Sequence, residues 1–156
     1  ARCLRGSGYE FVMIGRFQAD TARYLRLIDE ESASNPDFGY LGGMSPREVD
    51  EILLESEIFV STCEPEGFPN NIIQACLAKC VIISFNYDPD GVLGRYAAGY
   101  VPETFAGMVE IIQNLMAGKG DKEMAERARV YALEHHSLGR NMARFNEIFR
   151  QVIASR

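Results

Sequence analysis

The stretch that decides the fold is residues 58–85, IFVSTCEPEGFPNNIIQACLAKCVIISF. Two short apolar runs, residues 58–62 and 80–85, flank residues 70–79, for which the sequence predicts a helix. Nearly every position of the second run is apolar. Strands of that kind are buried on both faces, which is typical of a parallel sheet covered by helices. The stretch therefore predicts a strand–helix–strand unit of an α/β protein.

The same alternation of apolar runs and amphipathic segments continues in both directions. Towards the N-terminus it predicts strands over residues 9–14 and 38–41, with a helix from Asp20 to about Ser34 between them. Ser45-Pro46-Arg47-Glu48 has the residues of a capping box and predicts the start of another helix. Towards the C-terminus we expect a broken loop over residues 86–98 and a short strand over residues 99–101. Three helices should follow, over residues 105–116, 121–135 and 138–153. This order predicts a Rossmann-like, doubly wound parallel sheet flanked by helices, with the C-terminal helices packed on the lobe.

Length, charge and cysteine usage narrow the class of protein. A chain of 156 residues corresponds to one domain, and its net charge of −6 argues against binding nucleic acid through the phosphates. The four cysteines and two histidines lack the spacing of a zinc site, and we expect Cys76 and Cys80 to be small core residues. No leader or membrane-spanning apolar run is evident, so we expect a cytoplasmic domain. Because the chain opens at Ala1 without an initiator Met, we also expect further sequence upstream.

Three predicted strands end in residues suited to ligand binding, and α/β sheets bind ligands at that edge. Gly15-Arg16 follows the first strand, Gly42-Gly43 the second, and residues 63–69 the third. Glycine lets a ligand approach the backbone closely, and a helix that begins just beyond it offers free N–H groups to an anion.

Glu66 stands directly before a predicted helix N-terminus, and two interpretations of it stay open. Its carboxylate either bonds sugar hydroxyls while the nearby N–H groups face a phosphate, or only favours the positive end of the helix, an effect of about 0.3–1 kcal/mol. Gln74 falls one turn into the same helix, where its amide either reaches the same crevice or is solvated.

Residues 66–75, EGFPNNIIQA, resemble the donor-site signature of family 4 (group 1) retaining glycosyltransferases, which have the two-lobed GT-B fold. That signature has two glutamates separated by seven residues and follows a strand. The order of the surrounding elements is similar from about Tyr9 to Phe149. The resemblance implies that residues 1–156 are the nucleotide-sugar-binding lobe, the C-terminal half of such an enzyme, whose N-terminal acceptor lobe lies outside this chain. Such an enzyme transfers a hexose from a nucleotide-diphosphate sugar to a glycan or lipid-linked acceptor with retention, as in polysaccharide biosynthesis.

The resemblance also implies a role for each matching residue. Glu66 is the catalytic carboxylate that bonds hydroxyls of the donor sugar, and the backbone that follows it holds the sugar and the distal phosphate. Gln74 takes the place of the glutamate that grips the ribose. The substrate-binding positions implied are Gly15, Arg16, Gly42, Gly43, Gly67, Phe68, Pro69, Asn70 and Gln74. Gly42 and Gly43 belong near the base, and Arg16 is either a diphosphate ligand or a solvated surface charge. No metal or cofactor is expected, because helix N-termini and basic side chains offset the diphosphate charge.

The sequence departs from the family pattern at Gln74, and at Lys79 and Val81, where the family has a glycine and a proline. The alternative is a non-catalytic or degenerate α/β module used for protein contacts. We expect the isolated lobe to be inactive, and contact of the full-length protein with the inner face of a membrane stays open. The apolar C-terminal helices are suited to packing on a missing lobe or on another subunit. Three tyrosines near the broken loop are suited either to stacking on a ligand or to plain packing: Tyr87, Tyr96 and Tyr100.

Overall fold

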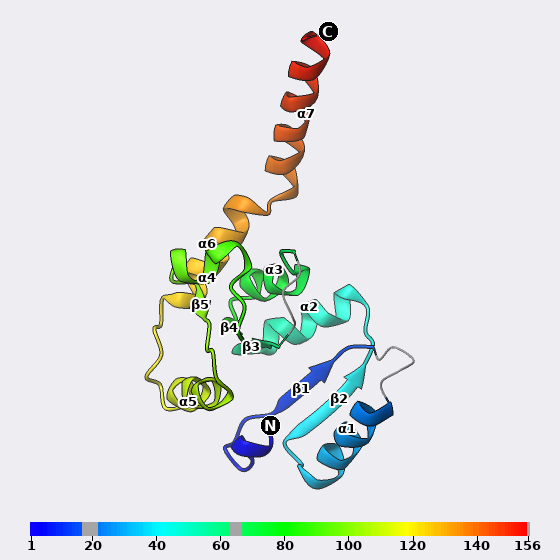
Figure 1. Cartoon of the computed structure of the whole chain (residues 1–156), viewed down its shortest axis with the longest axis vertical. Coiled ribbons are helices and arrows are strands. Elements are labelled where there is room, and N and C mark those ends of the chain that lie inside the picture. Colours follow the sequence, from blue (N-terminus) through cyan, green and yellow to red (C-terminus); the bar gives the residue numbers. More distant parts are fainter. Residues whose placement is uncertain (17–21, 63–66, 156) are drawn as a thin grey trace. The chain divides into compact units, whose positions relative to one another are not determined.

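A computed structural model of the chain describes residues 1–16, 22–62 and 67–155. The chain forms two compact units, Ala1–Ile52 and Leu53–Arg156, and each is described by itself. Figure 1 shows helices and strands alternating along the chain, as the sequence predicts.

The first unit is a pair of parallel strands with a helix between them in sequence. It contains the short 3-10 helix η1 (Arg2–Leu4), β1 (Phe11–Ile14), α1 (Ala22–Ser34) and β2 (Phe38–Gly42), and α2 (Pro46–Glu55) begins in it. β1 and β2 pair in parallel with Phe11 opposite Phe38. The capping box of α2 is confirmed, because the Ser45 N–H donates to Glu48 Oε2 at 2.8 Å and the Glu48 N–H donates to Ser45 Oγ at 3.4 Å.

The second unit is a three-stranded parallel sheet with helices packed on it. Its strands are β3 (Ile58–Ser61), β4 (Val81–Ser84) and β5 (Gly99–Tyr100), in the order β3–β4–β5. Its helices are α3 (Asn70–Leu77), α4 (Val92–Arg95), α5 (Phe105–Met116), α6 (Met124–His135) and α7 (Leu138–Ala154), with the 3-10 helix η2 (Pro89–Gly91) before α4. α3 packs against α6, and α6 also packs against β4. Ile72 of α3 and Ile82 and Ile83 of β4 are fully buried, as expected for strands covered by helices.

Cys76 and Cys80 are part of this core, which confirms their prediction as packing residues. Both side chains are buried, and burial raises the pKa of Cys76 to about 12 and that of Cys80 to about 11. Thiols that stay protonated in this way are poor nucleophiles and poor metal ligands.

The parallel α/β class is confirmed, but two details differ from the prediction. The described strands pair as two sheets, β1–β2 and β3–β4–β5, one in each unit, where the sequence pattern suggests one continuous sheet. The segment predicted as a broken loop contains η2 and α4. The carboxylate of Asp88 accepts hydrogen bonds from the N–H groups of Leu93 and Gly94, at 2.8 and 3.0 Å, and so stabilises a turn of helix among residues that usually interrupt one.

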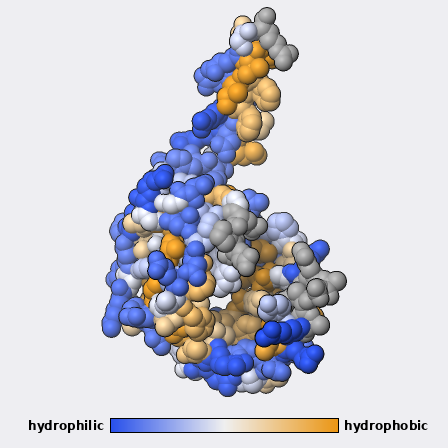
Figure 2. All heavy atoms as spheres, in the orientation of Figure 1, coloured by the Kyte–Doolittle hydropathy of each residue, from blue (hydrophilic) through white to orange (hydrophobic). Residues whose placement is uncertain are grey.

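The C-terminal helices differ from each other in how they pack. α6 lies on the sheet as expected, but α7 has no buried residue. Figure 1 shows α7 projecting away from α6, and Figure 2 shows an apolar stripe along one side of it. The expectation that the C-terminal helices pack on the lobe is therefore wrong for α7. No helix in the described part of the chain is both long and apolar enough to cross a membrane.

Candidate functional site

The connection from β3 to α3 holds the main group of predicted site residues. β3 ends at the buried Ser61, whose carbonyl oxygen accepts a hydrogen bond from the Phe85 N–H at 2.9 Å. Glu66, the predicted catalytic residue, lies outside the described residues. The segment that follows it, Gly67–Pro69, leads directly into α3, as the sequence predicts.

The N-cap residue of α3 provides no side-chain hydrogen bond to the N-terminus of this helix. Pro69 is the N-cap residue, and it is buried and has no side-chain acceptor for the first N–H groups of the helix. Oδ1 of Asn71 is a buried oxygen without a hydrogen-bond partner among the described residues. Such an atom is costly to leave unsatisfied, by about 1–3 kcal/mol. This end of α3 therefore offers uncapped N–H groups beside an acceptor that a hydroxyl or amide of a ligand can satisfy.

Gln74 lies one turn further along α3 and is half-buried. This position agrees with its prediction from sequence. Gly67 and Asn70 are exposed, whereas Phe68 is half-buried and Pro69 is buried. The substrate-binding candidates of this unit thus occupy one short loop and residues 70–74 of one helix.

The remaining candidates gather at the carboxyl ends of β1 and β2 in the first unit. Ile14 pairs with Gly42, and the Gly15 N–H donates to the Gly42 carbonyl oxygen at 2.9 Å. The Tyr40 hydroxyl donates to the Gly15 carbonyl oxygen at 2.7 Å, which fixes the strand end further. The structure therefore brings the two glycine turns together.

The side chain of Arg16 lies against Gly43. A Cβ atom at position 43 would meet the Arg16 side chain, with Cδ only 2.8 Å away. Gly42 has φ of +70°, a conformation that side chains disfavour. Arg16 is exposed at this strand end, and its interpretation as a diphosphate ligand stays a prediction.

Sequence reasoning missed a group of aromatic side chains behind the Gly67–Pro69 segment. The rings of Phe68, Tyr96, Tyr131, His135 and His136 contact one another; we refer to these five residues as the aromatic cluster. Of the tyrosines singled out from sequence, Tyr96 packs in this cluster, and the Tyr87 hydroxyl donates to the Gly67 carbonyl oxygen at 3.2 Å. The adjacent His135-His136 pair is the one sequence signal that could have drawn attention to it.

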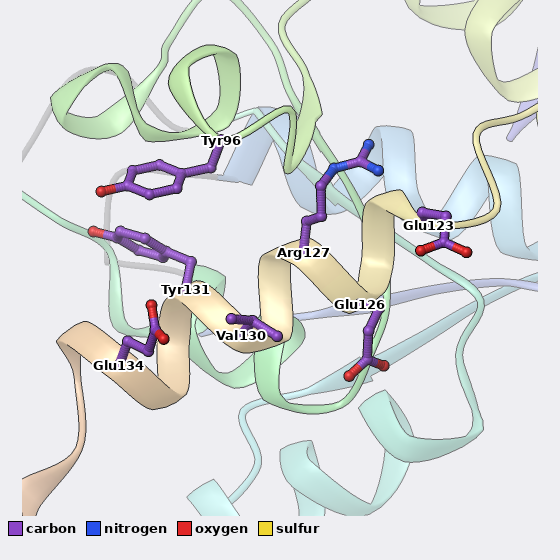
Figure 3. Close-up of a pocket in the computed structure, with 7 residues that line it drawn as sticks. All are labelled: Tyr96, Glu123, Glu126, Arg127, Val130, Tyr131 and Glu134. Carbon is purple, nitrogen blue, oxygen red and sulfur yellow. The ribbon is translucent and has the colours of Figure 1, made fainter.

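A shallow hollow of about 330 Å³ lies along α6 on the outer side of this cluster. Figure 3 shows Tyr96 and Tyr131 at one end of it, and Glu123, Glu126 and Arg127 towards the other. Two of its charged groups are already paired, because Glu126 binds Lys79 Nζ at 2.7 Å and Arg127 binds both Asp121 and the Ala97 carbonyl oxygen. None of the predicted site residues that the structure describes lines this hollow.

Comparison with known proteins identifies the family. Residues 3–135 match the family model described as glycosyl transferases group 1. The chain belongs to this family. The group 1 resemblance inferred from residues 66–75 is thereby confirmed, and the match extends over most of this glycosyltransferase chain. No curated protein matches the sequence.

Solved structures share the fold of this group 1 chain at low sequence identity. Anabaena Alr3699/HepE in complex with UDP has a TM-score of 0.74 at 12% identity, and the same protein in complex with UDP-glucose has 0.71 at 14%. TarM has a TM-score of 0.68 at 19% identity. These matches cover 95%, 94% and 90% of this chain but only 41%, 41% and 28% of the other chains. The chain therefore spans less than half the length of the proteins whose fold it shares.

Proposed function

We propose that this chain is the nucleotide-sugar-binding lobe of a two-lobed retaining glycosyltransferase of family 4. The observation that carries the proposal is the uncapped N-terminus of α3, placed directly after Gly67–Pro69 in a member of the group 1 family. The N–H groups there suit a phosphate, and the unsatisfied Oδ1 of Asn71 suits a hydroxyl donor. Fold relatives in complex with UDP and UDP-glucose support a nucleotide diphosphate sugar as the ligand class.

In this proposal Glu66 bonds hydroxyls of the donor sugar, and the backbone of Gly67–Asn70 holds the sugar and the distal phosphate. Gln74 bonds the ribose. Gly15 and Arg16 contact the diphosphate, and Gly42 and Gly43 lie near the base. The bond between the anomeric carbon and the distal phosphate oxygen breaks, and that carbon forms a bond to an acceptor hydroxyl, whose proton is lost. Helix N–H groups and Arg16 offset the charge of the departing diphosphate, so the proposal includes no metal.

In this proposal the acceptor binds to a companion lobe, and the exposed apolar face of α7 supports the existence of such a lobe. The apolar side chains of α7 are exposed, with Leu138 at 77%, Phe149 at 61% and Ile153 at 73%. Exposed apolar faces of this size usually mark an interaction surface. α7 comprises 17 of the 156 residues, so the match to Anabaena Alr3699/HepE, which covers 95% of this chain, includes part of α7. The match covers only 41% of the Alr3699/HepE chain, so more than half of that protein lies outside it. Without that lobe we expect donor binding with little or no turnover.

Calorimetric titration of the chain with UDP-, GDP- and ADP-sugars tests the proposal. We expect one nucleotide class to bind, and Glu66→Ala to weaken binding roughly 10- to 100-fold, because hydrogen bonds to a charged group contribute about 1.5–3 kcal/mol. Glu110→Ala, an exposed glutamate of α5, is the matched control and should bind like the parent chain. No heat with any donor at millimolar concentration would overturn the proposal and favour the non-catalytic module. Equal binding by Glu66→Ala would overturn the site assignment alone.

A further inference from the structure

Side chains from three separate segments meet at the C-terminal end of α6. Phe68 comes from the segment before α3, Tyr96 follows α4, and Tyr131, His135 and His136 come from the last turns of α6. Tyr131 is the centre of this cluster: its ring lies 4.8 Å from Tyr96 and 4.7 Å from His135. Figure 3 shows the rings of Tyr96 and Tyr131 lying next to each other.

The inner side of the cluster holds Phe68. The Phe68 ring lies 4.7 Å from the His136 ring and 6.2 Å from the Tyr131 ring, stacked on the latter with an interplanar angle of 28°. Tyr131 and His136 also fix each other, because the Tyr131 hydroxyl and His136 Nε2 are 3.3 Å apart and hydrogen-bonded. Phe68 therefore packs against a pair of rings whose orientation is itself determined by a hydrogen bond.

Phe68 anchors a backbone that has few other constraints. Gly67 is exposed and has no side chain, and among the described residues its backbone is constrained by Phe68, which follows it, and by the hydrogen bond from Tyr87 to its carbonyl oxygen. The rings of Tyr131 and His136 thus determine where the Gly67–Phe68 peptide lies. Binding groups have to be held within about 0.5 Å of their productive geometry, and packed side chains behind them supply that precision.

We propose that Tyr131 and His136 are positioning residues for the donor loop, which hold Phe68 and through it the Gly67 backbone that faces the donor sugar and distal phosphate. The inference rests on the proposed function and adds to it Tyr131 of α6 and His136, the C-cap residue of that helix, neither of which touches the donor. Tyr96 and His135 complete the cluster through their ring contacts with Tyr131. None of the ring contacts described above joins either of them to Phe68.

His136 gives this arrangement a measurable dependence on pH. The groups that face it are Tyr131 and His135 of α6, Asp90 of η2, and Phe68. Burial, and then the neighbouring His135, lower the pKa of His136 below 6.5, while Asp90 opposes this shift. As the pH falls below about 6.5, His136 binds a proton in the unfolded chain while it stays neutral in the folded chain. The free energy of unfolding therefore decreases as the pH falls below that value. In the protonated ring both nitrogens are donors, so the Tyr131 hydroxyl can then only accept the hydrogen bond from Nε2.

The first experiment follows the Gly67 and Phe68 amide resonances of the chain by NMR between pH 8 and 5.5, without ligand. We expect both to titrate with a midpoint below 6.5, and the titration to disappear in His136→Gln but persist in His135→Gln, the matched control. Amides that do not respond to pH, or the same titration in His136→Gln, would overturn the inference. Circular dichroism of each variant verifies that it is folded.

The second experiment measures binding of UDP-glucose, GDP-glucose and ADP-glucose at pH 7.5. We expect Tyr131→Phe to lower the affinity for the preferred donor roughly fivefold, which is the effect of one lost hydrogen bond. Tyr96→Phe, the matched control, should leave that affinity unchanged. Equal affinity of Tyr131→Phe and the parent chain would overturn the positioning role while leaving the proposed function intact. If no donor binds but the Gly67 amide resonance still titrates with His136, the proposed function fails and the coupling of α6 to the Gly67–Phe68 segment stands.

Discussion

Gln74 is the residue at which this chain departs most clearly from the donor-site signature of its family. It lies on α3 one turn beyond the helix N-terminus and is half-buried, and its match to the second glutamate of the signature stays a prediction from sequence. A neutral amide can donate and accept hydrogen bonds, but it lacks the charge that strengthens a carboxylate–hydroxyl contact. In the proposed site, the departure therefore lowers the strength expected of a hydrogen bond to the ribose.

Gln74→Glu tests this interpretation directly. We expect the variant to bind the preferred nucleotide sugar about fivefold more tightly than the parent chain, because charge-assisted hydrogen bonds are roughly twice as strong as neutral ones. Titration calorimetry at pH 7.5 gives the comparison. Gln113→Glu on α5 adds the same charge elsewhere in the unit and serves as the control. Unchanged or weaker binding by Gln74→Glu would contradict a ribose contact at this position.

At the scale of the element, the C-terminal end of α3 shows how the chain replaces a glycine that the family usually has. Lys79 adopts the left-handed conformation, with φ of +63°. Its N–H donates to the Cys76 carbonyl oxygen at 3.1 Å, and the Cys80 N–H donates to the Ala75 carbonyl oxygen at 3.0 Å. These are the two bonds of a Schellman motif, whose left-handed position favours glycine. The turn therefore has its usual form but contains a residue that strains it.

Comparing two variants at this position measures that strain. Lys79→Ala and Lys79→Gly both remove the ion pair between Lys79 Nζ and Glu126, so only the left-handed conformation distinguishes them. We expect Lys79→Gly to be more stable than Lys79→Ala by about 1 kcal/mol in the free energy of unfolding, measured by urea denaturation. Equal stability would show that the turn does not need a left-handed residue.

At the scale of the whole molecule, the most unusual feature is the apolar face of α7. Its exposed side chains recur at helical spacing and include Phe145 and Phe149, whose rings stack on each other 6.4 Å apart. Figure 2 shows that these residues form a continuous apolar stripe. α7 thus has the pattern of a helix that packs on a partner surface, although its own unit does not cover it.

Replacing both rings tests whether this face stabilises the chain by itself. We expect Phe145→Gln with Phe149→Gln to change the free energy of unfolding by less than about 0.5 kcal/mol, because both side chains are already in contact with water. Light scattering should show less self-association at high concentration. Ile72→Ala, in the core, should cost about 2–5 kcal/mol in the same urea assay. A loss above 2 kcal/mol in the double variant would show that the α7 face is covered within the chain.

Local patterns in the sequence determined most of the elements and the group of site residues on α3. The capping box at Ser45 and Glu48 and the helix over residues 105–116 agree with the structure, because hydrogen bonds and side-chain spacing within a few residues specify them. The glycine turns at Gly15 and Gly42 are likewise local signals. The turn of helix after Asp88 was missed, because a single side-chain cap there outweighed the glycine and proline around it.

Only the tertiary structure decided which apolar surfaces are covered and which side chains pack against Phe68. Ile28 of α1 is buried whereas Tyr24 and Leu25 are exposed, and α7 is amphipathic but uncovered. The contact of Phe68 with Tyr131 and His136 joins segments far apart in the chain. Periodicity states that a face is apolar but not which distant segment packs on it, since that depends on the path of the backbone and the packing of the whole unit.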